Sequence, residues 1–320
     1  MSSASRRITN LALLFLLAVA FASGWVAFEV SGQPARAVLF LHAAAGVAIV
    51  LLVPWKSLVA KRGFQRPRAL KWASIVLGIG VGISIVFGLL HASGHPNVGY
   101  LTAMDFHVGA AVCVIPFVLW HVVARPLRLR ATDFGRRSFI KGGLLAGSAG
   151  LVVAALPSAL RAPTGSFQSA QPLATTWMFD AVPTVNVASW TLVVGNRTLS
   201  YGELAGYTDR IWSVIDCTGG WYSEQVWEGA LLERLLPGAT GTASSLNVRS
   251  ITGYSRRFPL EDAGRMLLAT RMAGTDLDPG HGYPARLVVP GQRGFAWVKW
   301  VVAIDVDDQP WWWQPPFPLQ

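Results

Sequence analysis

Five apolar stretches, each about long enough to cross a bilayer as a helix, occupy the first half of this chain and limit its fold more than any other feature. They run at about 8–28, 37–55, 70–91, 104–124 and 140–160. A membrane-spanning helix needs roughly 20 mainly apolar residues. Hydrophobic residues make up 52% of the chain and charged residues only 14%, so the composition is not that of an ordinary soluble protein.

The basic residues predict how these spans are oriented. Lys and Arg are dense before the first span, between the second and third, and between the fourth and fifth, and they are nearly absent from the other two loops. Because Lys and Arg collect on the cytoplasmic side, we expect a multi-pass protein of the cell membrane with a cytoplasmic N-terminus. Everything after about Arg161 should then be extracytoplasmic. The net charge of +10 comes largely from these loops and gives no support for nucleic acid as a partner.

A pair of arginines precedes the fifth span. The segment Phe134-Gly135-Arg136-Arg137-Ser138-Phe139-Ile140-Lys141 leads into a Gly- and Ala-rich stretch and resembles a twin-arginine export signal placed internally. An ordinary basic flank of a membrane helix is the alternative. The stretch Ala159-Leu160-Arg161-Ala162 is a weak cleavage sequence, so we expect the helix to remain as an anchor.

Histidines inside the spans are candidates for function, because ionisable groups are costly in a bilayer. His42 lies near the start of the second span and His107 near the start of the fourth, and both spans run inward from the outer face. Neutral imidazole is a good axial ligand for haem iron. In its helices and histidines the bundle resembles b-type cytochromes. We expect one haem b held by His42 and His107, with His91 and His121 as alternative ligands; polar packing or a quinone site is the other interpretation.

The second half of the chain is organised around Ile215-Asp216-Cys217-Thr218-Gly219-Gly220-Trp221-Tyr222. β-capable residues lead up to Cys217 and a Gly pair permits a tight turn, so Cys217 is predicted to lie at a strand end. A disulfide with Cys113 is implausible, because Cys113 lies in the middle of the fourth span. A buried structural thiol is the alternative. The run Trp227–Leu236 is predicted to form a short amphipathic helix that ends at Pro237-Gly238.

Five elements in order resemble the oxidoreductase molybdopterin-binding fold of sulfite oxidases and periplasmic methionine sulfoxide reductases. They span roughly residues 175 to 315. The elements are the Cys-x-Gly turn, the Trp-x-Gly-x-x-Leu run after it, Thr252-Gly253-Tyr254 with Pro259-Leu260, His281-Gly282-Tyr283-Pro284-Ala285-Arg286-Leu287-Val288-Val289-Pro290-Gly291, and Gly294 to Lys299-Trp300.

The resemblance implies a molybdopterin cofactor and assigns roles to particular residues. Cys217 would be the thiolate ligand to molybdenum, a metal that suits soft sulfur ligands. Arg and Lys would hold the terminal phosphate, one as a planar fork and the other as a point charge. The residues assigned to the cofactor are Thr252, Gly253, His281, Arg286, Trp297, Val298 and Lys299. Thr184 and Asn186 are positional guesses only. Arg256 and Arg257 form either a substrate anion site or solvated charge.

The expected fold is an all-α transmembrane bundle of four helices plus a fifth anchor helix, followed by an α+β domain. The domains are predicted at 1–130 (helices), 131–161 (export segment and anchor), 162–175 (linker) and 176–320 (molybdopterin-binding oxidoreductase). Val193–Ser200 is predicted to be a hairpin with a Gly-Asn turn, and Tyr201-Gly202-Glu203-Leu204 to begin a helix. The Trp- and Pro-rich tail at 310–316 should pack across the domain or rest on a membrane interface.

The expected activity is two-electron oxo transfer on a small extracytoplasmic substrate. The membrane half would exchange electrons with quinone or another membrane carrier. Sulfite oxidases have arginines soon after the cysteine, whereas here Gly219-Gly220-Trp221 occupies that place, which favours a neutral substrate such as a sulfoxide. Oxidation of a sulfite-type substrate, with electrons passing inward, is the alternative. The non-enzymatic alternative is a membrane-anchored binding module without a cofactor.

Overall fold

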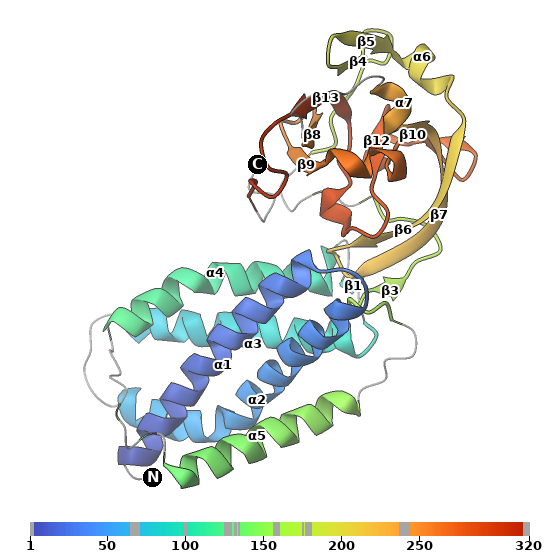
Figure 1. Cartoon of the computed structure of the whole chain (residues 1–320). Coiled ribbons are helices and arrows are strands. Elements are labelled where there is room, and N and C mark those ends of the chain that lie inside the picture. The colour runs from blue at the N-terminus through green and yellow to red at the C-terminus, as the bar shows by residue number, and fades with distance from the viewer. Residues whose placement is uncertain are drawn as a thin grey trace. The chain divides into compact units, whose positions relative to one another are not determined.

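The computed structural model divides the chain into two compact units, Met1–Phe167 and Gln168–Gln320 (Figure 1). The residues that the structure describes are 3–64, 71–95, 97–98, 101–124, 130, 133, 135–155, 161–174, 176, 181–236 and 244–315. Several predicted features lie outside the described residues, namely Phe134, the cleavage sequence at 159–160, the helix stop at Pro237-Gly238 and the last residue of the tail at 316.

The first unit consists of long helices and one short β-ladder. Its elements are α1 (Ser3–Glu29), α2 (Gly32–Phe64), α3 (Lys71–Ala92), β1 (Asn97–Val98), β2 (Leu101–Thr102), α4 (Ala103–Ala124) and α5 (Arg136–Ala154). Helix α1 packs along α2, α3 along α4, and α5 along α2. Asp105 fixes the start of α4, because its carboxylate accepts hydrogen bonds of 2.8 Å from both the backbone N–H and the hydroxyl of Thr102.

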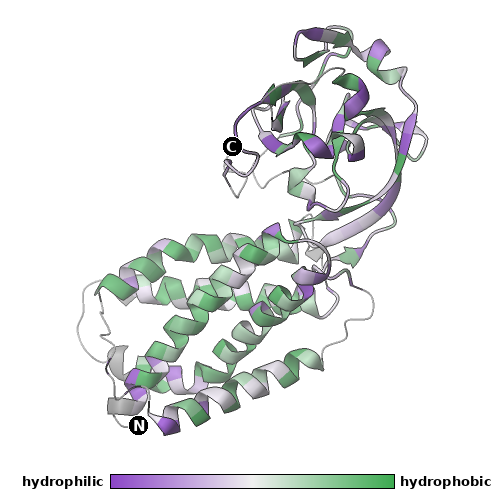
Figure 2. Ribbon diagram, in the orientation of Figure 1, coloured by the Kyte–Doolittle hydropathy of each residue, from purple (hydrophilic) through white to green (hydrophobic). Residues whose placement is uncertain are grey.

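Four of these helices are long and apolar enough to cross a membrane: Ser5–Glu29, Gly32–Lys61, Trp72–Ala92 and Ala103–Ala124. Figure 2 shows that hydrophobic residues predominate along them, and large apolar side chains such as Phe15, Ile79 and Val123 are more than half exposed. The predicted fifth span differs. It forms α5, but over the described residues α5 is not among the helices apolar enough to cross a membrane, and 156–160 lie outside the described residues.

The segment after α5 is ordered within the first unit, although it was expected to begin a linker. The guanidinium of Arg161 donates to the carbonyl of Ala92 at the end of α3. Nε2 of His91 lies 3.2 Å from the carbonyl oxygen of Gly165, and the His91 ring meets the Phe167 ring edge to face at 5.1 Å. His91 is therefore engaged with this segment rather than with the other helical histidines.

The second unit contains two β-sheets and short helices. One sheet has the order β11-β10-β7-β3, with β12 paired to β10 and β6 paired to β7; the other has the order β5-β4-β13-β8-β9, in which only β4 and β13 are parallel. The strands of the first sheet are β3 (Phe167–Gln168), β6 (Asp209–Cys217), β7 (Trp221–Leu231), β10 (Leu267–Met272), β11 (Thr275–Asp276) and β12 (Arg286–Val288). Those of the second are β4 (Thr191–Val194), β5 (Arg197–Ser200), β8 (Ser245–Ser250), β9 (Ser255–Pro259) and β13 (Val301–Asp307).

Short helices connect the strands and complete an α+β fold, as predicted. They are α6 (Tyr201–Ala205), α7 (Leu232–Leu235), η2 (Leu260–Arg265), η3 (Pro279–His281) and η4 (Gly294–Ala296). The core is one cluster of apolar side chains from both sheets and these helices. Its fully buried members include Leu192, Leu204, Trp227, Leu232, Leu246, Leu267, Leu287 and Ile304. The predicted hairpin at 193–200 is confirmed, and so is the helix at Tyr201, where Ser200 and Glu203 form a capping box.

The helix predicted at Trp227–Leu236 is wrong for its first half. Residues up to Leu231 continue β7, which pairs with β6 on one side and β10 on the other, and only Leu232–Leu235 is helical. Trp227, Gly229 and Ala230 are buried on both faces of a central strand. A strand buried on both faces is apolar without alternation, so its sequence can imitate a helical pattern.

The tail lies along β9. The backbone N–H of Arg257 donates to the side-chain oxygen of Gln314 at 2.9 Å, and the Gln314 amide donates to the carbonyl of Arg257 at 3.0 Å. The Gln314 side chain thus replaces a neighbouring strand at this edge. The three tryptophans before it, Trp311, Trp312 and Trp313, remain exposed.

Candidate functional site

Cys217 lies at the end of β6, where the chain turns into β7. The backbone N–H of Gly220 donates to the Cys217 carbonyl at 3.1 Å, and the N–H of Gly219 points at the Cys217 sulfur at 3.4 Å. Gly220 has φ of +87°, a backbone conformation that favours glycine. The turn therefore places a half-buried thiol at the end of the sheet, with an amide donor beside it. The strand-end position predicted for Cys217 is confirmed.

A second segment approaches the same strand end. A side chain at Gly294, the first residue of η4, would come within 3.1 Å of the Cys217 Cα and 3.2 Å of the Asp216 carbonyl, so only glycine allows this approach. Next to it, the guanidinium of Arg293 donates to the Asp216 carboxylate at 2.7 Å, and both side chains are largely buried. This ion pair fixes the strand that carries the thiol.

The thiol faces a small cavity of about 50 Å³. Its lining combines apolar side chains with two cations. Its lining residues are Leu173, Ile215, Cys217, Trp221, Arg286, Gly294 and Lys299. A thiol and two positive side chains therefore converge from β6, β12 and the segment after η4.

Arg286 is a buried cation without a carboxylate among its described contacts. Only 3% of the residue is exposed, one guanidinium nitrogen donates to the His281 carbonyl at 3.3 Å, and Nε has no hydrogen-bond partner. The guanidinium lies over the rings of Trp227 and Trp297, at 5.5 and 5.6 Å from their centroids. Burial lowers the pKa of Arg286 to about 10, although the nearby Cys217 sulfur opposes the shift. Such a group is stabilised when an anion occupies the cavity.

Lys299 is the second buried cation. Its ammonium donates to the Gly280 carbonyl at 2.6 Å and lies 5.5 Å from the centroid of the Trp300 ring. Burial, helped by the neighbouring charge of Arg286, lowers the pKa of Lys299 to about 7, while Cys217 and Asp278 oppose the shift. At neutral pH this side chain is therefore close to half protonated, and a bound anion would favour its charged form.

His281 is close to the site, but both ring nitrogens are already engaged. Nδ1 lies 2.5 Å from the Asp278 carboxylate and Nε2 lies 2.9 Å from the Pro172 carbonyl oxygen. The imidazole thus fastens the segment that contains Leu173 to η3. The direct cofactor contact predicted for His281 stays a prediction.

The other residues assigned to the cofactor do not line the cavity. Thr252 and Gly253 form the exposed turn between β8 and β9, and the Thr252 hydroxyl bonds to the Ser250 hydroxyl at 3.0 Å. Trp297 and Val298 are almost completely buried; Trp297 stacks on Arg286, and the Val298 carbonyl accepts from the N–H of Leu287 at 2.8 Å. Their side chains shape the walls behind the cations.

The four remaining candidates are not free binding groups at the cavity. Arg256 donates to the Pro315 carbonyl at 2.8 Å and lies over the Phe295 ring, and Arg257 pairs with Asp307. These two arginines are therefore neither solvated charge nor an open anion site. Thr184 and Asn186 are exposed and do not line the cavity.

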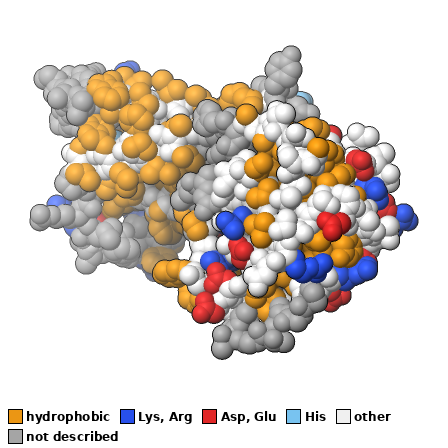
Figure 3. Space-filling model, turned by 90° about the horizontal axis from the view of Figure 1, so that it is seen from above, with side chains coloured by type: hydrophobic (Ala, Val, Ile, Leu, Met, Phe, Trp, Pro, Cys, Tyr) orange, Lys and Arg blue, Asp and Glu red, His pale blue; other side chains and the backbone are white. Residues whose placement is uncertain are grey.

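Figure 3 shows that charged side chains are frequent on the face of the second unit in view and sparse on the helices.

The helical unit brings His42 and His107 together. Their ring centroids lie 5.7 Å apart and the rings are nearly perpendicular, at 85°. Nδ1 of His42 lies 2.9 Å from the Ala20 carbonyl oxygen, and Nδ1 of His107 lies 2.7 Å from that of Ser84. A carbonyl oxygen only accepts, so each Nδ1 carries the hydrogen and each Nε2 keeps its lone pair. His121 lies on α4 beside Trp120 and does not join this pair.

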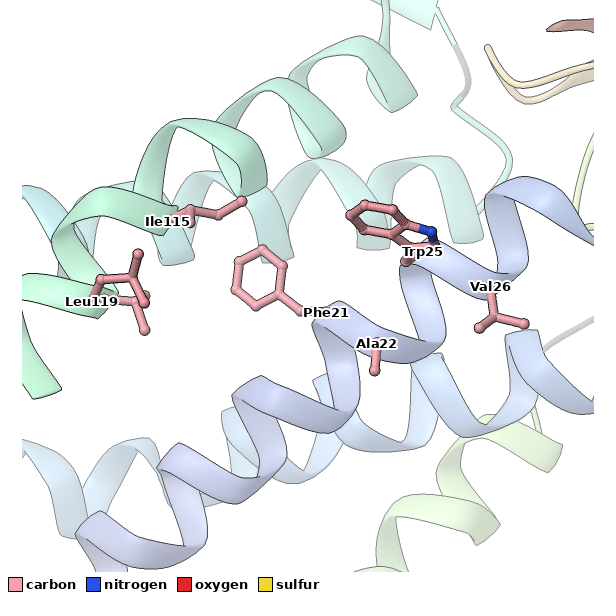
Figure 4. Close-up of a pocket in the computed structure, with 7 residues that line it drawn as sticks. Phe21, Ala22, Trp25, Val26, Ile115 and Leu119 are labelled. Atoms are coloured by element: carbon pink, nitrogen blue, oxygen red, sulfur yellow. The ribbon is translucent and has the colours of Figure 1, made fainter. Parts of the chain in front are cut away.

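An apolar groove runs between α1 and α4. It encloses about 550 Å³ and is lined by Phe21, Ala22, Trp25, Val26, Ile115, Val118 and Leu119. Figure 4 shows Phe21 of α1 and Ile115 of α4 pointing toward each other across it. The walls are suited to an apolar ring or chain.

Comparison with known proteins defines the class of the second unit. Residues 179–313 match the family model of the oxidoreductase molybdopterin binding domain. Stretches of the chain are 43% identical over 84 residues to a nitrate reductase (NADPH) of Mycosarcoma maydis and 46% identical over 57 residues to a sulfite oxidase of Gallus gallus. These stretches cover 26% and 17% of this chain, and only 7% and 12% of those two enzymes.

The solved structure of the sulfane dehydrogenase SoxCD from Paracoccus pantotrophus aligns over 40% of each chain, with a TM-score of 0.38 and 24% identity, which is too little to support a conclusion.

The second unit is thus an oxidoreductase molybdopterin-binding domain with homologues among sulfite oxidases and nitrate reductases. The resemblance inferred from the Cys217 turn and the later motifs is confirmed for this domain. In the sequence, this domain follows a unit that contains four long apolar helices.

The sequence did not single out several residues that build these sites. Leu173 lies in a stretch expected to be linker, and Arg293 is a lone arginine in a loop, so neither had a motif to mark it. In the helical unit, Gly24 and Gly88 lie against the two histidine rings. A glycine within an apolar helix gives no sequence indication of what the neighbouring helix places beside it.

Proposed function

We propose that this chain is a membrane-anchored molybdenum-cofactor oxidoreductase that carries out two-electron oxo transfer on a small extracytoplasmic substrate, with a sulfoxide-type reduction favoured. The observation that carries the proposal is the buried guanidinium of Arg286, which has an unsatisfied Nε and lies with Lys299 in the cavity of the Cys217 thiol. A cofactor with anionic groups and a thiophilic metal fits this donor set.

The bound cofactor would supply the oxo-transfer chemistry, and the chain's own residues would hold it. Cys217 would bind the metal through its thiolate, oriented by the N–H of Gly219. Arg286 and Lys299 would bind the anionic groups, which offsets the cost of burying the two cations. Trp221 and Ile215 would exclude water from the reacting atoms.

Entry of the cofactor requires the cavity to widen. Ligand pockets hold roughly 300–1,000 Å³, whereas this cavity measures about 50 Å³. The segment carrying Leu173 is the wall best able to move, because Leu173 is 40% exposed and the segment is held by single hydrogen bonds to Tyr222, Gln225 and His281. We expect these bonds to be exchanged when the cofactor binds.

The partners of the described arginines favour a neutral substrate. Arg293 is paired with Asp216, Arg257 with Asp307, and Arg256 contacts a carbonyl and an aromatic ring. Among the described arginines near Cys217, that leaves Arg286, which the cofactor would occupy. A dianion such as sulfite, or the nitrate reduced by some relatives, would then lack a free guanidinium at the mouth of the cavity.

The helical unit would carry electrons to or from the site. Two imidazoles with free Nε2 lone pairs on neighbouring helices suit the iron of one haem b, which would relay single electrons when bound. The apolar groove between α1 and α4 suits a quinone as the membrane carrier. The exposed Arg136-Arg137 pair at the start of α5 and the basic loops support export of the second unit across the cell membrane.

The proposal is tested with detergent-purified full-length protein. Molybdenum analysis should give one metal per chain, and an optical spectrum should show the bands of a low-spin haem b. Turnover with a reduced dye should be measured against a methyl sulfoxide, nitrate and, in the oxidative direction, sulfite. Faster turnover with sulfite than with the sulfoxide would reverse the proposed direction, and absence of molybdenum would refute the proposed enzyme.

A further inference from the structure

His42 and His107 of the helical unit are held in the same way, although they lie on different helix pairs. His42 of α2 donates from Nδ1 to the Ala20 carbonyl of α1, and His107 of α4 donates from Nδ1 to the Ser84 carbonyl of α3. In each pair a glycine follows the acceptor by four residues, Gly24 after Ala20 and Gly88 after Ser84. Residues four apart on a helix lie on one face, so carbonyl and glycine face the same ring.

Each glycine is needed for its ring to reach the carbonyl. A Cβ at Gly24 would lie 3.0 Å from Cε1 and 3.2 Å from Nδ1 of His42, and a Cβ at Gly88 would lie 2.9 Å from Nδ1 and 3.1 Å from Cε1 of His107. These approaches are closer than ordinary van der Waals contact, and a buried ring has little room to yield. A methyl group at either position would displace the imidazole from its acceptor.

Other glycines of the same helices are not placed in this way. A Cβ at Gly78 or Gly82 of α3, or at Gly46 of α2, would meet nothing within 4 Å. Of the six glycines Gly24, Gly46, Gly78, Gly80, Gly82 and Gly88, only Gly24 and Gly88 approach a histidine ring, and Gly80 instead admits Val114 of α4. The same arrangement of carbonyl and glycine therefore occurs at both His42 and His107, which indicates that both rings must be held in a defined orientation.

We infer that Gly24 and Gly88 are positioning residues that, with the carbonyls of Ala20 and Ser84, set the orientation of the two imidazoles as axial ligands. The inference rests on the proposed haem. Among the described residues, no hydrogen bond reaches Nε2 of His42 or His107. A ligating histidine commonly donates its other N–H to a carbonyl, which fixes the ring and raises the basicity of the ligating nitrogen. Here the helix backbone supplies that partner, and the glycine admits the ring.

The test compares Gly24→Ala and Gly88→Ala with the matched substitutions Gly46→Ala and Gly82→Ala in full-length detergent-purified protein. Haem per chain, the affinity for added haemin, the low-spin electron paramagnetic resonance spectrum and the midpoint potential are measured. Loss of such an outer partner lowers metal affinity by about 10- to 100-fold. We expect that loss, a changed resonance spectrum and a higher potential in the first two variants, and wild-type values in the matched pair.

A second measurement separates orientation from general packing. In His107→Gly protein supplied with free imidazole, the ring is no longer tethered to α4, so adding Gly88→Ala should have little further effect on haem affinity. The two substitutions should therefore be strongly non-additive. Additive losses would assign Gly88 a packing role and overturn the inference.

The remaining outcomes are also decisive. Wild-type haem content, spectrum and potential in both Gly24→Ala and Gly88→Ala would overturn the inference and leave the proposed haem intact. Wild-type protein that binds no haem would overturn the proposed electron path and, with it, the inference. Molybdenum content serves as the folding control for the second unit in every variant.

Discussion

The cavity of the second unit and the histidine pair of the helical unit are both suited to bind a cofactor, but they differ in how their nitrogen atoms are satisfied. Around Cys217, the guanidinium of Arg286 is buried against a backbone carbonyl and two aromatic rings, and its Nε has no hydrogen-bond partner, while the buried ammonium of Lys299 donates to the Gly280 carbonyl. Between the helices, two histidines each donate one N–H to a carbonyl and keep the other nitrogen open. The first site holds buried charge with a hydrogen-bond donor left unpaired at Arg286. In the second site each histidine has its Nδ1 hydrogen bond, and only Nε2 keeps a lone pair available.

The difference has an energetic meaning. A buried charge without a counter-ion destabilises the fold until an anion arrives, so binding of the cofactor and stability of the second unit should be strongly linked. A neutral imidazole with one hydrogen bond imposes a much smaller cost in an apolar environment. Removing the ligand should therefore affect the stability of the second unit more than that of the helices.

The largest effect is expected for Cys217→Ser. Loss of outer partners of a metal lowers affinity by about 10- to 100-fold, and loss of a direct sulfur ligand should exceed this, so we expect oxo transfer to fall by more than about 100-fold. Cys113→Ser is the matched control, because Cys113 is a free thiol exposed on α4. Turnover per chain is the measurement. An equal loss of turnover in both variants would show that Cys217 has no specific role in oxo transfer.

Arg286→Met should change stability and cofactor content in opposite directions. Replacing buried charge by an apolar side chain of similar volume often stabilises a protein by about 1–4 kcal/mol, so the cofactor-free second unit should unfold at a higher temperature while its molybdenum content falls. Arg249→Met, which breaks an exposed pair with Asp305, is the control and should alter neither. A destabilised variant with full molybdenum content would contradict the interpretation of Arg286 as an anion-binding group.

The lowered pKa of Lys299 predicts that the stability of the second unit depends on pH. Its pKa is lowered to about 7 in the folded protein from 10.5, so between these values the unfolded chain binds one more proton than the folded one. Stability of the cofactor-free protein should therefore rise with pH from about 7, by up to about 1.4 kcal/mol per pH unit. Lys299→Met should lack this slope. The free energy of unfolding of both forms, measured from pH 6 to 10, provides the check, and parallel curves would show that Lys299 stays protonated.

The smallest effect is expected at Arg257, which was one candidate for a substrate anion site. Arg257→Gln removes a partly exposed pair with Asp307 and should lower the free energy of unfolding by about 1 kcal/mol or less. The KM for sulfite, nitrate or a sulfoxide should not change, because the paired guanidinium is not at the cavity. A KM raised for sulfite and nitrate but not for the sulfoxide would show that Arg257 binds a substrate anion.

Local patterns predicted most of the elements and half of the site. The apolar spans marked α1 to α4, the Gly-Asn turn marked the β4–β5 hairpin, and the Cys217 turn with the later motifs marked the molybdopterin-binding domain. The prediction was wrong at Trp227–Leu231, where pairing with both β6 and β10 overrode an amphipathic pattern. Arg256 and Arg257 could not be resolved from sequence, because their partners, Pro315 and Asp307, come more than 45 residues later.

The sequence by itself determined the division into an apolar helical half and an α+β half, and it determined that Cys217 lies at a strand end. Hydrophobic length and short turn motifs are local properties, so they can be read along the chain. Only the tertiary structure decided that Arg286 and Lys299 line one cavity with Cys217, and that Gly24 and Gly88 lie against His42 and His107. Burial and close approach depend on what distant segments place around a residue, and no local pattern records that.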